Sequence, residues 1–542
     1  MSLWSMISSK IKEVISKMIG SRTIEQTLKV TPSISSQMEE AIQLWSDMYK
    51  NKAPWLKEPT YNNPTRIVSL GLPAMIASEK ARTALLEFKS EITVPKEEDD
   101  KQSTDSTPSI DKKSSEKSKD NNEQRAEFLN SQYNKLKRKL RTQIEYGIAK
   151  GGLIIKPYVV EIKDSNGGKS YELEFDFCQA DCFYPLSFNA SGTITEAAFL
   201  QTIIKKDIIY RRLEYHKYEN SVVTIINKAY KSTSNNTDDG MTGVDLGQEV
   251  QLTEVPEWSE LQPEVRIKDV KKPLFAYFKM PQANTIDTSS PLGVSAYQRA
   301  IGLIKDADMQ YSRLLWEYEG GELAIDIDRD ALNFETDGQG NTHSVMSTLQ
   351  QRLYRKVDIE TDGSTYYPYA PALRDANYLQ GLNAILMRIE DAVELSRGTL
   401  SDAASEARTA TELKILKQRS YQANADLQQA IQEAIEDTIY ACNVYCTLYK
   451  MTPEGKYEVS YDWDDSILVD VDTELGKQLS LLQNGLTTKR RIIMWYNGMT
   501  EEQADELLEE IQKESTEAME QNMMAQKQLG DDEDDEDESK RR

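Results

Sequence analysis

A long helical pattern occupies the second half of the chain. Apolar residues recur at helical spacing from Thr411 to Tyr449, and one continuous helix over this range would extend about 60 Å. A helix of that length does not fit inside one small domain. Because the chain has 542 residues, more than a single hydrophobic core usually supports, we expect roughly three or four compact units.

Two further helical patterns precede the long one and enclose a segment of mixed character. They cover residues 295–318 and 375–396. Between them, residues 319–374 combine short extended stretches with a helix expected at residues 344–354. After the second helix, residues 397–410 are rich in small side chains and show no core pattern, which predicts an exposed loop.

The first half of the chain combines helices with strands. Helical patterns cover residues 23–50, 64–90 and 123–150. Patterns with a period of two predict strands at residues 153–162, 171–177, 193–204, 208–216, 222–230 and 274–279. Most of these strands follow one another directly, so we expect an antiparallel meander. The predicted fold class is α+β, with long helices plus a small, mostly antiparallel sheet.

Two polar segments lack the apolar residues that a packed element needs. In residues 95–125, Ile110 is the only member of the hydrophobic class, and in residues 516–542 eight consecutive acids run from Asp531 to Glu538. We predict that both segments are disordered. Helices are expected shortly before the acidic tail, at residues 471–483 and 488–497.

The charge of the chain restricts how it can interact with nucleic acids. The formal net charge is −24, and the acidity is spread along the sequence. Proteins that clamp duplex DNA usually carry a basic patch, because counterion release supplies most of their affinity. The composition therefore argues against a sequence-reading DNA-binding protein. It is compatible with a wall past which DNA slides, since such a wall needs few adhesive phosphate contacts.

No membrane-spanning helix is expected, because no stretch reaches the roughly 18 uninterrupted apolar residues that a span requires. The N-terminus has an amphipathic helical pattern, but Lys10, Lys12 and Lys17 interrupt it and argue against a signal peptide. Such a basic amphipathic helix favours docking on another protein over binding to a membrane surface.

Candidate metal ligands are few. The chain has four cysteines and two histidines, which are Cys178, Cys182, Cys442, Cys446, His216 and His343. Neither cysteine pair has the tight CxxC spacing typical of zinc sites. We therefore expect reduced, partly buried thiols, and neither a metal nor another cofactor.

The motifs of common enzyme chemistry are absent. The sequence contains no GxxxxGK[ST] phosphate loop, no GxGxxG after a strand, no GxSxG elbow and no HExxH. The enzyme-like signal that remains is clustered carboxylates, namely Asp326, Asp328 and Asp330, and later Asp462, Asp464, Asp465, Asp470 and Asp472. Such clusters can bind the two metals of a nuclease, but chance produces them among 89 acidic residues. We expect no enzyme and keep a metal-dependent nuclease as an alternative.

The order of the parts resembles that of phage portal proteins: a helix, a mixed insertion, a returning helix, a small-residue loop and a very long helix. Local sequences add to the resemblance. They are Asn63-Pro-Thr-Arg-Ile-Val-Ser-Leu-Gly-Leu72, Ser289-Ser-Pro-Leu-Gly-Val-Ser-Ala-Tyr297, Arg397-Gly-Thr-Leu-Ser401, Ala407-Arg-Thr-Ala-Thr-Glu412 and Leu482-Gln-Asn-Gly-Leu-Thr487. Together they look like portal proteins of long-tailed phages that infect Gram-positive bacteria, and the resemblance spans residues 30–515 approximately.

The resemblance implies a portal fold with wing, stem, clip and crown regions. The wing would comprise residues 1–294 and 411–470, with residues 95–125 as an insertion. The other implied regions are the stem helices 295–318 and 375–396, the clip 319–374, the tunnel loop 397–410 and the crown 471–515. The acidic tail, residues 516–542, is an addition to a minimal portal.

The resemblance also implies a role in the virion. The chain would form a homo-oligomeric ring, dodecameric in the virion, at one capsid vertex, after assembly in the host cytoplasm. Double-stranded DNA would pass through this channel during packaging and ejection, without sequence specificity. The implied partners are the terminase large subunit, a head-tail adaptor, and the major capsid and scaffold proteins, with no membrane. The alternatives are a metal-dependent nuclease of the packaging machinery and a helical scaffold or minor capsid protein, which would form no closed ring.

In this family the tunnel loop faces the DNA. The candidate residues in this chain are Arg397, Thr399, Ser401, Asp402, Ser405, Glu406 and Arg408. Arg397 and Arg408 at the loop ends would touch phosphates transiently, whereas the acids between them would repel phosphates. We expect weak, salt-sensitive contact without sequence preference.

Overall fold

The computed structural model divides the chain into two compact units, residues 1–463 and 464–542. The residues it describes are 27–28, 33–56, 66–86, 88–95, 112–163, 169–206, 208–232, 246–321, 324–328, 334–336, 342–344, 354–357, 366–369, 371–402, 410–463, 471–497, 499, 504–505 and 507–513.

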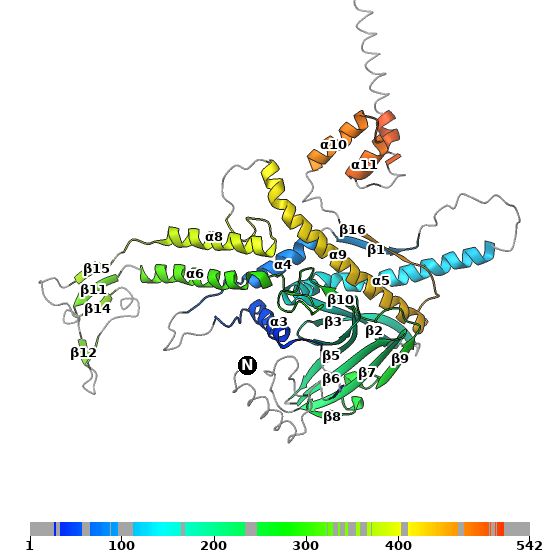
Figure 1. Ribbon diagram of the computed structural model, residues 1–542, viewed down its shortest axis with the longest axis horizontal. Coiled ribbons are helices and arrows are strands. Elements are labelled where there is room, and N and C mark those ends of the chain that lie inside the picture. Colours follow the sequence, from blue (N-terminus) through cyan, green and yellow to red (C-terminus); the bar gives the residue numbers. More distant parts are fainter. Residues whose placement is uncertain are drawn as a thin grey trace, which may run out of the picture. The chain divides into compact units, whose positions relative to one another are not determined.

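Two antiparallel sheets carry most of the strands of the first unit (Figure 1). In the smaller sheet, β2 (Gly152–Lys163) lies between β3 (Lys169–Gln179) and β10 (Ala276–Lys279). The larger sheet has the order β4 (Phe183–Phe188), β5 (Ile194–Lys205), β6 (Ile208–Glu219), β7 (Val222–Ser232) and β8 (Gln248–Val250), and β9 (Glu264–Lys268) also pairs with β7. The α+β class is therefore confirmed.

The consecutive strands predicted from the sequence are present, but they do not form one meander. The chain leaves the smaller sheet after β3, turns through a hydrogen bond from the Cys182 amide to the Gln179 carbonyl, and starts the larger sheet with β4. Strand β4 was not predicted, because Phe183 to Leu186 are all buried and show no alternation. A strand buried on both faces lacks the period of two that identifies half-buried strands.

Two long helices cover the core of the first unit. Helix α5 (Lys112–Lys150) packs on β2 and β3 and against α9 (Ala410–Leu448). The buried apolar stripe of α5 comprises Leu129, Tyr133, Leu136, Leu140, Ile144 and Ile148. Their spacing of three and four residues places them on one helix face, and α3 (Ser36–Tyr49) and α4 (Leu72–Ala84) add further buried residues to the same core.

Helix α5 begins at Lys112, earlier than the start expected near residue 123, so disorder was wrongly predicted for residues 112–125. Low apolar content argues against burial, but Lys, Glu and Gln are good helix formers. Arg125 is also fully buried, and its guanidinium donates hydrogen bonds to the Pro453 carbonyl and the Thr447 hydroxyl, each 3.0 Å long. Residues 96–111 of the same predicted segment lie outside the described residues.

The helix predicted for residues 64–90 is right only in its middle part. Helix α4 covers Leu72–Ala84, and Phe88–Thr93 forms β1, which pairs antiparallel with β16 (Glu458–Trp463). Gly71 adopts φ 72° directly before α4, and a proline follows in its first turn. Proline is favoured in the first turn and not in the helix interior, so the helix starts here.

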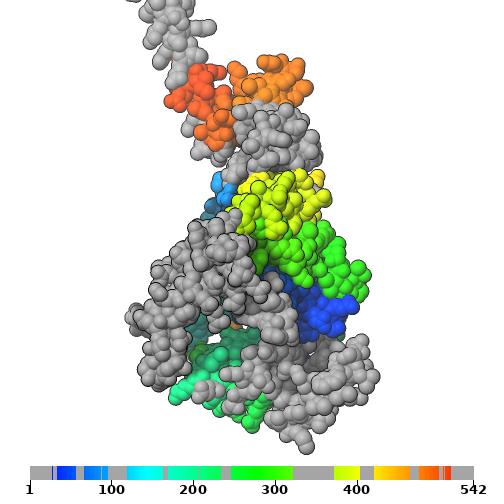
Figure 2. All heavy atoms as spheres, turned by 90° about the vertical axis from the view of Figure 1, so that its left-hand side faces the viewer, coloured from blue at the N-terminus to red at the C-terminus, as the bar shows by residue number. Residues whose placement is uncertain are grey.

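The two helices predicted on either side of the mixed segment pack along each other. They are α6 (Ile301–Gly320), which follows the short helix η3 (Gln298–Ala300), and α8 (Asp375–Val393). Figure 2 shows α8 lying on α6. The blue N-terminal segment in the same view contacts α6 through the Trp55 indole, which donates a hydrogen bond to Asp308. The first turn that we expected from Ser295 is replaced by η3 and the turn before it, so the regular helix starts at Ile301.

Short strands lie between α6 and α8. Strand β11 (Ala324–Asp328) pairs in parallel with β14 (Tyr354–Val357) and antiparallel with β15 (Tyr366–Tyr369), while β12 (Phe334–Thr336) pairs with β13 (Thr342–Ser344). The helix expected at residues 344–354 falls mainly on residues 345–353, which lie outside the described residues.

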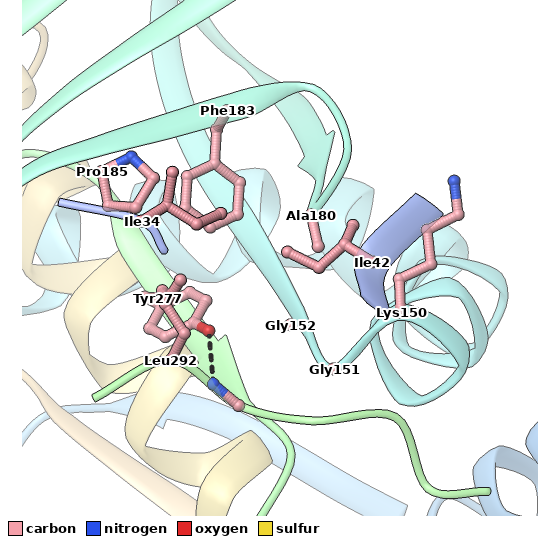
Figure 3. Close-up of a pocket in the computed structure, with 11 residues that line it drawn as sticks. Ile34, Ile42, Lys150, Gly151, Gly152, Ala180, Phe183, Pro185, Tyr277 and Leu292 are labelled. Atoms are coloured by element: carbon pink, nitrogen blue, oxygen red, sulfur yellow. Dashed lines mark hydrogen bonds between the residues drawn. The ribbon is translucent and has the colours of Figure 1, made fainter. Parts of the chain in front are cut away.

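Gly293 lies where two backbone segments of the chain cross. It belongs to one of the local sequences that resemble portal proteins. A Cβ atom on Gly293 would lie 2.1 Å from the Gly151 carbonyl oxygen, so only glycine fits. Its amide donates a 3.1 Å hydrogen bond to the Tyr277 hydroxyl (Figure 3). The cavity beside this crossing, also lined by Phe183 and Pro185, has room for about one water molecule. It is a packing gap and not a ligand pocket.

The second unit contains α10 (Val471–Gln483) and α11 (Lys489–Asn497). Both helices agree with the sequence prediction within one residue. Large apolar side chains remain exposed on this unit, among them Leu486, Trp495 and Tyr496.

Candidate functional site

The predicted tunnel loop begins where α8 ends, and its first residues fold back on that helix. Glu394 adopts φ 60° at the helix end, and the Leu395 amide donates to the Glu390 carbonyl. Gly398, with φ 87°, provides a second turn. The Thr399 hydroxyl donates to the Ser396 carbonyl at 2.6 Å. We call residues 395–402 the loop root.

The carboxylate of Glu390 holds the loop root on α8. Its Oε1 atom accepts hydrogen bonds from the amides of Leu400 at 2.6 Å and Ser401 at 2.8 Å. Its Oε2 atom accepts from the Ser401 hydroxyl at 2.8 Å and from the Gly398 amide at 3.3 Å. Glu390 is completely buried. Hydrogen bonds to an ionised group are the stronger kind, so this carboxylate stabilises the conformation of residues 398–401.

Two further α8 side chains contact the loop root. The Asn383 side-chain oxygen accepts a 2.8 Å hydrogen bond from the Asp402 amide. Asp391 forms an ion pair with Arg397 through both oxygens, with the shorter N···O distance at 2.7 Å. Both of these contacts are exposed, in contrast to those of Glu390.

Cations compensate for the glutamates in the last turn of α8. A helix C-terminus disfavours negative charge because the backbone dipole ends there with its negative pole. Arg299 lies 3.5 Å from the Glu394 carboxylate. Lys80, from α4, is almost completely buried. Burial lowers the pKa of Lys80 to about 8, and the nearby negative charge of Glu394 opposes this shift.

The described residues include four of the seven candidate tunnel-loop residues. Arg397 and Asp402 are exposed, and a phosphate at Arg397 would compete with Asp391. Ser401 is buried against Glu390, and the Thr399 hydroxyl is bonded to the loop's own backbone, so both hold the local structure. The remaining candidates, Ser405, Glu406 and Arg408, lie outside the described residues.

Glu390 and Asn383 were missed by the sequence analysis. Glu390 directly follows Ile389, which belongs to the buried apolar stripe of α8. A carboxylate beside such a stripe, near a loop of small residues, was the available signal. It did not identify the partners, because they are backbone amides, which carry no sequence pattern.

A second polar contact ties α6 to the segment before α4. The buried Asp308 carboxylate accepts hydrogen bonds from the Trp55 indole and the Leu70 amide, both 2.9 Å long. Ser312, one turn further along α6, accepts from the Val68 amide at 2.8 Å. Burial raises the pKa of Asp308, although these donors favour its charged form. The extended residues 66–70 are thereby fixed along α6.

Where the chain leaves α6 and returns into α8, one ion pair joins the two helices. Arg374 forms a bidentate pair with Glu317, with N···O distances of 2.7 and 3.0 Å. The Arg374 amide also donates to the same carboxylate at 3.0 Å. This contact fixes the start of α8 beside the end of α6.

Of the clustered carboxylates that suggested a nuclease, Asp330, Asp464, Asp465 and Asp470 lie outside the described residues, and Asp326, Asp328, Asp462 and Asp472 lie within the described part of the chain. No group of three or more His, Cys, Asp or Glu side chains there has the arrangement of a metal site. His216 is buried and bonded to Glu214 at 2.7 Å. Burial raises the pKa of the Cys178 thiol to about 12, which makes it a poor nucleophile. Within the described part of the chain, none of the helices combines the length and apolar character that crossing a bilayer requires.

Comparison with known proteins identifies the family. Residues 34–520 match the family described as phage portal protein, SPP1 Gp6-like, so the chain belongs to this family. The family is structural and acts in phage DNA packaging at the capsid vertex. No curated protein shows significant similarity to the chain. The resemblance inferred from the sequence is thus confirmed, whereas a Gram-positive host stays a prediction.

Proposed function

We propose that this protein is the subunit of a closed ring, dodecameric in the virion, through which double-stranded DNA is packaged and later ejected. In this proposal α6 and α8 are the stem helices, and the chain between them is the clip. Residues 397–410 are the tunnel loop, residues 1–294 and 411–470 the wing, and residues 471–515 the crown. The subunits assemble in the host cytoplasm and remain in the virion.

Exposed apolar side chains on the stem helices carry the ring proposal. Trp316 on α6 is 71% exposed, and Leu379 on α8 is 47% exposed. Tyr318, near the end of α6, and Leu373, in the clip, are also exposed. Packing between copies would remove the apolar surface of these large side chains from water, which favours association. Neighbouring copies in a closed ring would cover such residues on every subunit at once.

The loop root supports a DNA contact that is weak and independent of sequence. Its exposed cation, Arg397, is already neutralised by Asp391, and the next exposed charge, Asp402, is negative. Phosphates therefore meet few attractive charges there, which suits a surface past which DNA moves. The net charge of −24 also disfavours tight binding of phosphates.

The position of the clip supports a role in docking. It leaves the stem after α6 and returns at α8, so in a ring the clips of all subunits would gather at one end of the stem. We propose that the terminase large subunit binds there during packaging and a head-tail adaptor afterwards. The major capsid and scaffold proteins are further partners in assembly.

Reversing the charge of the tunnel loop tests this proposal. Asp402→Lys combined with Glu406→Lys should slow or stall packaging, because phosphates would then be held by the loop. Packaging rate and packaged DNA length would be measured, with Glu260→Lys combined with Asp269→Lys, both exposed on the wing, as the control for net charge. Unchanged rate and length in the loop variant would refute a tunnel loop that DNA passes.

A further inference from the structure

The loop root runs back along α8 in the direction opposite to the helix. Glu390 contacts residues 398–401, and Asn383, seven residues earlier in the helix, contacts Asp402. A separation of seven residues is about two helical turns, so both side chains lie on the same side of α8, about 10 Å apart along its axis. The tunnel loop therefore leaves the stem beside the middle of α8 and not beyond its end.

The two attachments differ in strength. Glu390 is completely buried and accepts four hydrogen bonds, from the amides of Gly398, Leu400 and Ser401 and from the Ser401 hydroxyl. Asn383 accepts one hydrogen bond, from an exposed amide. An exposed hydrogen bond between neutral groups opens much more readily than a group of buried hydrogen bonds that one charged carboxylate accepts. The chain is thus held firmly up to Ser401 and weakly at Asp402.

We propose that Glu390 is the positioning residue of the tunnel loop. It fixes residues 398–401 on α8 and makes the Ser401–Asp402 junction the point from which the loop departs. This inference rests on the proposed function of residues 397–410 as the tunnel loop. It divides the candidate residues into two groups. Thr399 and Ser401 belong to the residues that Glu390 fixes, Arg397 is paired with Asp391, and the weakly held part of the loop starts at Asp402.

Hydrogen exchange of single amides in the purified, assembled protein tests the attachment itself. The amides of Leu400 and Ser401 should exchange at least about tenfold more slowly than that of Asp402, because only the former are bonded to a buried charge. Glu390→Gln keeps the shape but removes the charge, and should speed exchange at Leu400 and Ser401 about tenfold or more. Asn383→Ala should affect Asp402 alone.

Equal exchange at all three amides in the wild type would overturn the proposal, and so would an unchanged pattern in Glu390→Gln. Ser401→Ala, which removes one of the four hydrogen bonds, provides a milder variant in case Glu390→Gln does not fold. It should produce a smaller change at the same two amides. Asp391→Asn breaks the Arg397 ion pair on the same helix and should leave both amides protected.

Packaging by the same variants connects the attachment to function. Glu390→Gln should reduce the packaging rate several-fold while rings still form, and Asn383→Ala should have little effect. Normal packaging by Glu390→Gln, with its Leu400 and Ser401 amides deprotected, would show that this carboxylate does not position the loop. Failure of the proposed function gives a different result. If residues 397–410 are not the tunnel loop, Asp402→Lys with Glu406→Lys leaves packaging unchanged, while the Leu400 and Ser401 amides still exchange more slowly than the Asp402 amide.

Discussion

Lys80 shows how a single buried charge shapes this protein. Its pKa is lowered to about 8 by burial, against the opposing effect of Glu394. The folded state therefore releases the proton of the Lys80 ammonium group more readily than the unfolded state, in which this group has its ordinary pKa of 10.5. Below pH 8 both states carry the charge, and the folded state bears the full cost of burying it. Between pH 8 and 10.5 the unfolded state binds more protons, so this cost falls as the pH rises.

Lys80→Met should therefore stabilise the protein at pH 7, by at most about 3 kcal/mol from the size of the pKa shift. The gain should shrink as the pH approaches 10.5. Thermal unfolding of variant and wild type at several pH values measures it, with Lys139→Met on the exposed face of α5 as control. Arg299 still pairs with Glu394 in the variant. A lower Tm of the variant at pH 7 would show that Lys80 contributes a net attraction. A gain that does not change with pH would show that the buried charge is not its cause.

At the scale of elements, α6 is fixed to the chain before α4 by a few polar groups. Asp308→Ala removes the acceptor of two donors, the Trp55 indole and the Leu70 amide. Leaving such donors unpaired costs about 1–3 kcal/mol each, so we expect a loss of at least about 2 kcal/mol in the free energy of unfolding. Limited proteolysis should also cut residues 66–70 faster. Denaturant unfolding measures the first effect.

Asp306, two residues earlier on the same helix, is exposed and provides the matched control. Asp306→Ala should change the free energy of unfolding by less than about 0.5 kcal/mol. If the two alanine variants are equally stable, the contacts of Asp308 do not hold the extended segment on α6.

Sequence patterns predicted the helices better than the sheets, for physical reasons. The ends of α9 and α10 agree with the prediction within one residue, because the helical period depends only on local spacing. The pairing of β2 with β10 joins residues more than a hundred positions apart, and no local pattern encodes such a partner. In β1 buried and exposed residues alternate, but only its first three residues fall within the helix predicted for residues 64–90, and no strand was predicted there.

The candidate site was predicted only in outline. The small-residue loop after α8 was located from its lack of a core pattern, and its root does start where α8 ends. The role of Ser401 was not predictable, because burial of a small polar residue depends on a tertiary partner, here Glu390. Composition alone cannot distinguish a serine that faces a channel from one that anchors a loop.

At the scale of the whole molecule, the central claim is that exposed residues of α6 and α8 become buried between copies in a closed ring. Trp316→Glu places a charge where a neighbour would pack, and should leave the protein as monomers or small, open assemblies. Ile204→Glu is the matched control, because Ile204 is 68% exposed on β5 of the larger sheet. This control should still form rings.

The mass of the intact assembly, measured under native conditions on the purified protein and its Trp316→Glu variant, tests this claim most directly. We predict a single closed assembly of many copies for the wild type, with an axial opening in particle images, and loss of that assembly in the variant. A wild-type protein that stays monomeric under all assembly conditions, or a variant that closes the same ring, would contradict the account.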